Sequence, residues 1–176
     1  MMLKEPKISN TKLTLVKGDV TDTDADAFVF YARNDLQLGS GYGTAITLRG
    51  GPGIKKELDA IGRVATGKAV ATGAGEMKAK VIIHACGPKF QEEDEEKKLR
   101  DTMQSSLKCA DEKGVKTLAF PPMGSGFYGI PLDMCRKVMI EEIRKHLEGK
   151  TCLEEVRIVV PDPREEGPFG EAIKSL

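Results

Sequence analysis

A glycine-rich loop at residues 124–129 contains the residues of this sequence best suited to hold an anionic ligand. It reads Gly-Ser-Gly-Phe-Tyr-Gly, follows the short apolar run 118–120, and precedes a predicted helix over about 132–147. Closely spaced glycines let backbone N–H groups approach a phosphate, and the N-terminus of the next helix adds partial positive charge. Ser125 could add a hydroxyl donor, and Phe127 or Tyr128 could cover a sugar or a base. The loop favours a phosphate ligand, while a plain tight turn remains the alternative.

Two familiar phosphate-binding motifs do not describe this loop. No Lys-Ser or Lys-Thr pair follows its last glycine, so it is not a P-loop. Gly124, Gly126 and Gly129 do have the G-x-G-x-x-G spacing. They lie late in the chain, however, with no acidic residue at the end of a following strand, as the dinucleotide fingerprint requires.

Hydrophobic periodicity predicts strands that alternate with helices. Strands are expected at 11–17, 27–32, 68–73, 80–86, 116–120 and 156–160, the last stopped by Pro161-Asp162-Pro163. Helices are expected at 44–48, 52–61, about 99–113 with a charged entry from Gln91, 132–147 and 170–175. This alternation indicates an α/β domain with a largely parallel sheet. No linker divides the chain, so we expect one domain over residues 1–176, with 1–10 as an N-terminal tail or edge segment.

Three polar segments follow predicted strands and should meet at one edge of the sheet. They are Gly18–Asp19, the stretch 31–43 with its second glycine-rich loop Gly39-Ser40-Gly41-Tyr42-Gly43, and the loop 124–129. Parallel sheets bind ligands at the carboxyl ends of their strands. Two glycine-rich loops suit a diphosphate, and the Asp19 carboxylate suits the exocyclic amine of adenine, although Asp19 could also be a turn residue.

Composition restricts the class of partner. Lys plus Arg number 27, as do Asp plus Glu, so no overall field recruits nucleic acid or an anionic membrane. Four dispersed cysteines and two histidines give no metal-binding spacing, so we expect no metal and no cofactor. No run approaches membrane-spanning length and no signal-peptide core is present, which predicts a cytoplasmic protein with reduced thiols. His84 lies in an apolar strand and is interpreted as a core histidine.

At this point the chain resembles the macro domains, the ADP-ribose-binding modules, from about Leu13 to Leu176. Three segments carry the resemblance in the correct order: Gly18-Asp19-Val20-Thr21, the strand signature 81–88, and the loop 120–129. The resemblance implies a three-layer α/β/α fold with a mixed, largely parallel, six-stranded sheet. It implies that the ligand is ADP-ribose or a related ADP-ribosyl metabolite. The ADP-ribosyl group could also be attached to a partner protein.

The resemblance also assigns parts of the ligand to residues. Asp19 and Val20 would serve the adenine, and backbone N–H groups of the loop at 124–129 would hold the phosphates. Gly41-Tyr42-Gly43 would close over the diphosphate and the distal ribose. The implied ligand-binding set is Asp19, Val20, Ala32, Arg33, Gly41, Tyr42, Gly43, Gly124, Ser125, Gly126, Phe127 and Tyr128.

One segment departs from the family pattern. Members that hydrolyse ADP-ribose esters carry Asn-Ala-Ala-Asn after the second strand, whereas this chain has Phe30-Tyr31-Ala32-Arg33, with Asn34 one position late. Arg33 cannot accept a hydrogen bond from a ribose hydroxyl, because a guanidinium only donates. Asn34 is therefore the one catalytic candidate, and binding is better supported than catalysis. The alternatives are an ADP-ribosyl hydrolase, an ADP-ribose 1″-phosphate phosphatase, and a module for poly(ADP-ribose) or nucleic acid, of which nucleic acid fits the zero net charge least.

Overall fold

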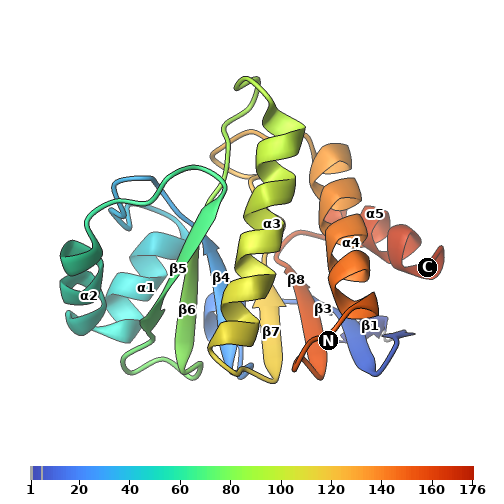
Figure 1. Cartoon of the computed structure of the whole chain (residues 1–176), viewed down its shortest axis with the longest axis horizontal. Helices are drawn as coiled ribbons and strands as arrows, with labels where there is room; N and C mark the ends of the chain where they lie inside the picture. The colour runs from blue at the N-terminus through green and yellow to red at the C-terminus, as the bar shows by residue number, and fades with distance from the viewer. Residues whose placement is uncertain (1, 5) are drawn as a thin grey trace.

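The computed structural model describes residues 2–4 and 6–176 as one mixed sheet with helices on both faces (Figure 1). Its strands are β1 (Met2–Lys4), β2 (Lys7–Ile8), β3 (Thr11–Lys17), β4 (Ala27–Tyr31), β5 (Lys68–Gly73), β6 (Val81–Cys86), β7 (Thr117–Phe120) and β8 (Glu155–Val160). Its helices are the short 3₁₀ turn η1 (Val20–Asp22) and α1 (Tyr42–Gly50), α2 (Gly53–Ile61), α3 (Glu95–Glu112), α4 (Leu132–Glu148) and α5 (Pro163–Lys174).

The strands are arranged in the order β1-β3-β8-β7-β4-β6-β5, with β2 paired to β3 beside β1. The central pairs β3–β8, β8–β7, β7–β4 and β4–β6 are parallel, whereas β1, β2 and β5 pair antiparallel. The carboxyl ends of β3, β8, β7 and β4 therefore lie along one edge, at the top of Figure 1, where the chain leaves β7 for α4. This edge is the one at which α/β proteins bind ligands.

Strand β4 shows why its sequence is an unbroken apolar run. Ala27, Val29 and Tyr31 point into one apolar cluster, and Phe28 and Phe30 point into a second cluster on the opposite face. Alternate side chains of a strand face opposite sides of its sheet, so a strand covered on both sides must be apolar at every position.

The two clusters correspond to the two helical layers. The first is formed with α3, α4 and α5, through residues such as Met103, Ile143 and Phe169. The second is formed with α1 and α2, through Ile46 and Leu58. This layering confirms the predicted α/β/α class, and the additional strands β1 and β2 extend the expected six-stranded sheet at its β3 edge.

The expected start of the last helix is wrong. The sequence pattern predicts a start at Gly170, but α5 begins at Pro163, and the side chain of Asp162 accepts a hydrogen bond from the backbone N–H of Arg164 at 2.9 Å. Asp at the N-cap followed by Pro at the first helical position is a start signal, because proline lacks the N–H that this position leaves unpaired anyway. The pair Asp162-Pro163 therefore ends β8 and also begins α5.

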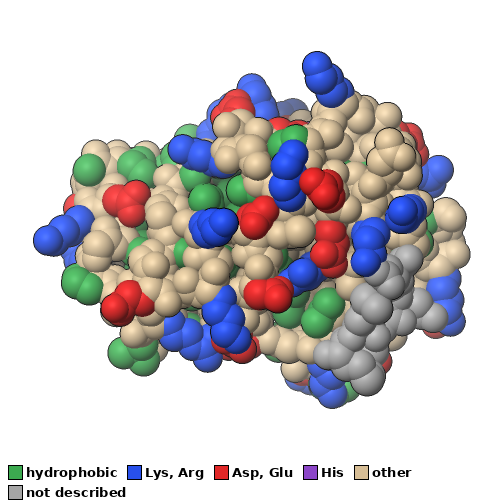
Figure 2. All heavy atoms as spheres, turned by 90° about the horizontal axis from the view of Figure 1, so that it is seen from below, with side chains coloured by type: hydrophobic (Ala, Val, Ile, Leu, Met, Phe, Trp, Pro, Cys, Tyr) green, Lys and Arg blue, Asp and Glu red, His purple; other side chains and the backbone are tan. Residues whose placement is uncertain are grey.

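The face opposite the strand carboxyl ends carries charges of both signs on the residues that the structure describes (Figure 2). Seen from below, Lys and Arg are interspersed with Asp and Glu over the whole view (Figure 2). In the part of the chain that the structure describes, no helix is both long and apolar enough to cross a bilayer.

Candidate functional site: a cleft at the strand carboxyl ends

Two adjoining cavities form a cleft over the carboxyl ends of β8, β7 and β4. One, of about 430 Å³, is lined by Phe30, Tyr31, Arg33, Leu38, Gly39, Ser40, Gly41, Tyr42, Pro121, Pro122, Gly124, Gly126, Phe127 and Tyr128. The other, of about 490 Å³, is lined by Tyr42, Pro122, Ser125, Gly126, Leu132, Pro161, Asp162, Arg164 and Glu165. Tyr42, Pro122 and Gly126 border both, so a ligand that fills both must pass these three residues.

The order of the strands gives the cleft a direction. Pro161 and Asp162 follow β8, the loop after Phe120 follows β7, and Arg33 follows β4. Because β8, β7 and β4 are neighbours in this order, the second cavity is the β8 end of the cleft and the first is the β4 end.

The loop at 124–129 leaves a row of backbone donors without acceptors. Gly129 N–H donates to Gly126 O at 3.0 Å, and Ile130 N–H donates to Gly124 O at 2.9 Å, which closes the loop on itself. The N–H groups of residues 125–128 donate to no group in the described part of the chain. Gly124 has φ 82°, and a Cβ there would lie 2.7 Å from Ile130 and 3.0 Å from Tyr31. The loop thus leaves four consecutive backbone N–H groups free to bind an anion.

The loop at 39–43 faces it from the other side and leads into α1. Gly41 precedes α1 with φ 62° and supplies no side-chain cap to its first turn. Gly43 is tightly enclosed, because a Cβ on it would lie 1.7 Å from the carbonyl oxygen of Leu38. An uncapped helix N-terminus directed at a cleft favours an anionic ligand there.

Tyr42 has an unpaired hydroxyl at the junction of the two cavities. Its oxygen is buried and has no hydrogen-bond partner among the described residues. Burial, together with the negative charges of Asp19 and Glu165, raises the pKa of Tyr42 to about 12. The hydroxyl therefore stays protonated at neutral pH, and because its oxygen is buried, it can donate to a ligand only if the side chain turns toward the cleft.

Asp19 lies beside the cleft rather than in its wall. One carboxylate oxygen accepts from Thr21 N–H at 2.9 Å and from the Thr21 hydroxyl at 2.7 Å, and the other pairs with Arg49 at 3.2 Å. Burial opposes ionisation of Asp19, but the bonds from Thr21 and the charge of Arg49 outweigh it and lower its pKa. It lines an adjoining groove along β3 and β8. The Val20 side chain is buried in the second apolar cluster, so Val20 can meet a ligand only through its backbone.

Aromatic rings dominate the β4 end. The Tyr31 hydroxyl donates to Pro88 O, and its ring packs on that of Tyr128 with 4.6 Å between centroids. Phe127 is 92% exposed at the rim and meets Tyr128 edge-on at 5.6 Å. Arg33 is the only charged residue in this wall, and its guanidinium pairs with Asp35 at 2.7 Å. The wall therefore offers one cation and no carboxylate.

Asn34 and Ala32, two of the predicted site residues, face away from both cavities. The Asn34 amide donates to Val64 O at 2.8 Å and to the Thr66 hydroxyl at 3.2 Å. Ala32 is buried, and its N–H donates to Ala85 O within the sheet. The one-residue shift of Asn34 thus turns its amide to the segment 64–66, where both of its protons are used.

Sequence reasoning missed Glu165, Pro161 and Asp162 at the β8 end, because it treated the segment before residue 170 as a strand stop. The signal was present in Asp162-Pro163 followed by the acidic first turn of a helix. The sequence pattern also does not predict that Leu38, Pro121 and Pro122 line the first cavity, because their position there depends on how the loops pack.

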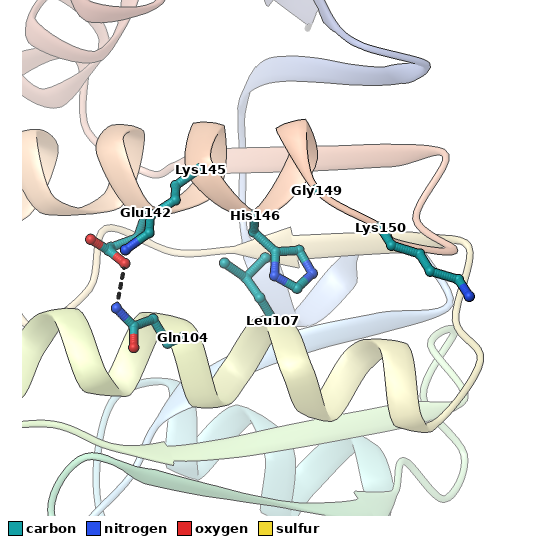
Figure 3. A pocket seen from close by; sticks show the side chains of 7 residues that line it. All are labelled: Gln104, Leu107, Glu142, Lys145, His146, Gly149 and Lys150. Atoms are coloured by element: carbon teal, nitrogen blue, oxygen red, sulfur yellow. Dashed lines mark hydrogen bonds between the residues drawn. The ribbon is translucent and has the colours of Figure 1, made fainter.

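A separate groove of about 320 Å³ lies between α3 and α4 (Figure 3). Its polar groups serve helix packing: Glu142 accepts from Gln104 at 2.7 Å and pairs with Arg100 at 2.9 Å, and His146 pairs with Asp111 at 2.7 Å. Over residues 2–4 and 6–176, no cluster of three His, Cys, Asp or Glu side chains could hold a metal ion. His84 is buried in the core, where its Nε2 contacts the Thr72 hydroxyl at 2.9 Å.

Comparison with known proteins shows which family this chain resembles. Residues 32–139 match the family model of the Macro domain. A Macro domain-containing protein of Caldanaerobacter subterraneus subsp. tengcongensis is 39% identical over 171 residues, which cover 94% of this chain and 97% of the relative. The O-acetyl-ADP-ribose deacetylase 1 of Pantoea vagans is 35% identical over 157 residues, covering 86% and 92%. The fold is similar to that of the Oceanobacillus iheyensis macrodomain solved with ADP, with a TM-score of 0.93, 23% identity, and coverage of 99% of this chain and 97% of that one.

Proposed function

Because the chain belongs to the Macro domain family, we propose that it binds ADP-ribose, or a closely related ADP-ribosyl metabolite, in the cleft at the carboxyl ends of its parallel strands. The adenosine lies at the β8 end, the diphosphate lies between the two glycine-rich loops, and the distal ribose lies at the β4 end. An ADP-ribosylated protein side chain is a second form of the same ligand.

The observation that carries this proposal is the row of N–H groups at residues 125–128. Such donors bind an anion without reorganisation, because the loop is already closed by its own hydrogen bonds. The α1 N-terminus faces them from the opposite loop. A diphosphate is the anionic group that can use both walls at once, and the cavities on either side leave room for an adenosine and a ribose.

Titration calorimetry with ADP-ribose, AMP and ribose 5-phosphate tests this function. ADP-ribose should bind most tightly, because only it fills both ends of the cleft. Asp19→Ala should weaken ADP-ribose about tenfold, as expected for a hydrogen bond to a charged group, and should leave ribose 5-phosphate nearly unchanged. Equal losses for the two ligands would remove the assignment of Asp19 to the adenine.

Hydrolysis of an ADP-ribosyl ester is the second candidate, and the relative named O-acetyl-ADP-ribose deacetylase supports it. The β4 end supports it less, because its wall contains no His, Cys or carboxylate and Asn34 is engaged elsewhere. Catalysis there would depend on positioning of the substrate and a water. Turnover of O-acetyl-ADP-ribose or ADP-ribose 1″-phosphate at a stoichiometric enzyme concentration would establish this activity, and its absence would leave a binding module.

A further inference from the structure

Glu165, in the first turn of α5, brings a carboxylate into the β8 end of the cleft. Its Oε2 accepts a hydrogen bond from the hydroxyl of Ser125 at 3.2 Å, which holds it beside the loop at 124–129. It is half-buried and forms no ion pair within residues 2–4 and 6–176. Its negative charge also contributes to the raised pKa of Tyr42, whose hydroxyl has no partner among the described residues.

The other carboxylates near this end accept more hydrogen bonds from the protein than Glu165 does. Asp162 caps α5 and pairs with Arg164, and Asp19 holds Thr21 and Arg49. Glu165 accepts from the Ser125 hydroxyl and interacts with the backbone N–H of Asp162, and its remaining acceptor capacity is free. An ionised carboxylate accepts hydrogen bonds and donates none, and it repels phosphate. Its partner in a ligand must therefore be a hydrogen-bond donor that lies close to the diphosphate but is not part of it.

Resting on the proposed function, we propose that Glu165 binds the hydroxyls of the ribose next to the adenine and thereby excludes ligands whose ribose carries a 2′-phosphate. This ribose is joined directly to the diphosphate, so it lies within reach of a residue that contacts Ser125, whereas the adenine lies one group farther away. Nucleotide-binding enzymes of other folds use an acidic residue on the ribose 2′-hydroxyl in the same way, and replace it where a 2′-phosphate must be admitted.

The test compares ADP-ribose with 2′-phospho-ADP-ribose by calorimetry, in the wild type, in Glu165→Gln and in Glu166→Gln. Glu166 is the adjacent acidic residue on the same helical turn and lines neither cavity, which makes it the matched control. The wild type and Glu166→Gln should bind ADP-ribose at least about tenfold more tightly than 2′-phospho-ADP-ribose. An effect of about this size is expected for the loss of a hydrogen bond to a charged group. In Glu165→Gln the preference should fall below about threefold, because the amide neither repels phosphate nor accepts as strongly.

Binding of 2′-deoxy-ADP-ribose gives a second readout. Loss of the hydroxyl should weaken binding to the wild type and have little further effect in Glu165→Gln, as a double-mutant cycle requires for interacting groups. If ADP-ribose binds but the preference over the 2′-phosphate is the same in Glu165→Gln as in the wild type, the role of Glu165 is wrong and the proposed function stands. If the wild type does not bind ADP-ribose, both are wrong.

Discussion

The two ends of the cleft differ in the chemistry that they offer to a ligand. At the β8 end the wall contains the carboxylates of Glu165 and Asp162 beside the Arg164 guanidinium and the Ser125 hydroxyl, with Asp19 nearby, and the carboxylates can accept hydrogen bonds from an amine or from hydroxyls. At the β4 end the wall contains five aromatic residues, two prolines and glycine-rich backbone, and its one charged side chain is that of Arg33. The first end thus offers carboxylate acceptors to a ligand, whereas the second offers only hydroxyl and carbonyl acceptors beside its rings. This contrast suits the two ends to different parts of a ligand.

A substitution in the loop at 39–43, next to Tyr42 at the meeting point of the two ends, gives the largest expected effect. Gly43→Ala places a Cβ 1.7 Å from Leu38 O, so the loop at 39–43 must move and α1 with it. We expect a loss of about 3 kcal/mol in the free energy of unfolding, as for severe overpacking, and loss of ligand binding at both ends. Urea unfolding and calorimetry measure the two effects.

Gly126→Ala is the control for that substitution, since a Cβ on Gly126 meets no atom within 4 Å. Its free energy of unfolding should change by less than about 0.5 kcal/mol, as for most surface positions. A Gly43→Ala protein as stable as the wild type would show that the loop adapts, and that the two ends are not joined by a rigid wall.

The β4 end also depends on a buried histidine beneath it. His84 meets the Phe30 ring edge-on at 6.0 Å, and burial lowers its pKa from 6.5 to about 4. Below pH 6.5 the unfolded chain binds a proton at His84 that the folded protein does not, so stability falls as the pH is lowered towards 4. The slope contributed by this group should approach about 1.4 kcal/mol per pH unit.

Urea unfolding between pH 7 and 5 measures that slope. His84→Gln should flatten it, because the variant has no group to protonate at this position. His146→Gln, a change at the other, partly exposed histidine, is the matched control. Equal slopes in the wild type and in His84→Gln would contradict the prediction.

The junction of the two ends gives a smaller effect. In Tyr42→Phe the free protein loses a buried hydroxyl that had no partner, so its stability should be unchanged or raised by up to about 1 kcal/mol. ADP-ribose affinity should fall about fivefold if the side chain turns toward the ligand on binding, because the ligand then loses a donor. Thermal unfolding and calorimetry on the same samples separate the two effects, and an unchanged affinity would show that the hydroxyl never meets the ligand.

Substitution of Arg33 at the β4 end should have the smallest effect on ADP-ribose affinity. Its guanidinium is exposed and paired with Asp35, and exposed ion pairs contribute little. Arg33→Ala should change ADP-ribose affinity by about twofold or less, with Asp35→Ala as the control for the pair. A loss as large as that of Asp19→Ala would mean that the β4 end recognises the ligand as strongly as the β8 end, which would erase the contrast between them.

The parts of this structure that follow from local pattern could be predicted from sequence. The alternating and continuous apolar runs predict the strands β3 to β8. The glycine spacing predicts a loop at 124–129 whose N–H groups are available to a ligand. The direction of the Asn34 side chain could not be predicted, because it depends on Val64 and Thr66, thirty residues or more away in sequence. Glu165 was missed for a different reason: the capping signal at Asp162-Pro163 was present but was interpreted only as the end of a strand.

The most direct test of the central claim is calorimetric titration of ADP-ribose into the wild type and into Gly126→Val. Gly126 lines both cavities and has free space around it, so valine should leave the fold intact and fill the middle of the cleft. The wild type should bind one ADP-ribose, and the folded variant should lose at least about tenfold in affinity, since overpacking of 1–3 kcal/mol falls on the bound state alone. Equal binding by the two proteins, or no binding by the wild type, would contradict the assignment of this cleft to ADP-ribose.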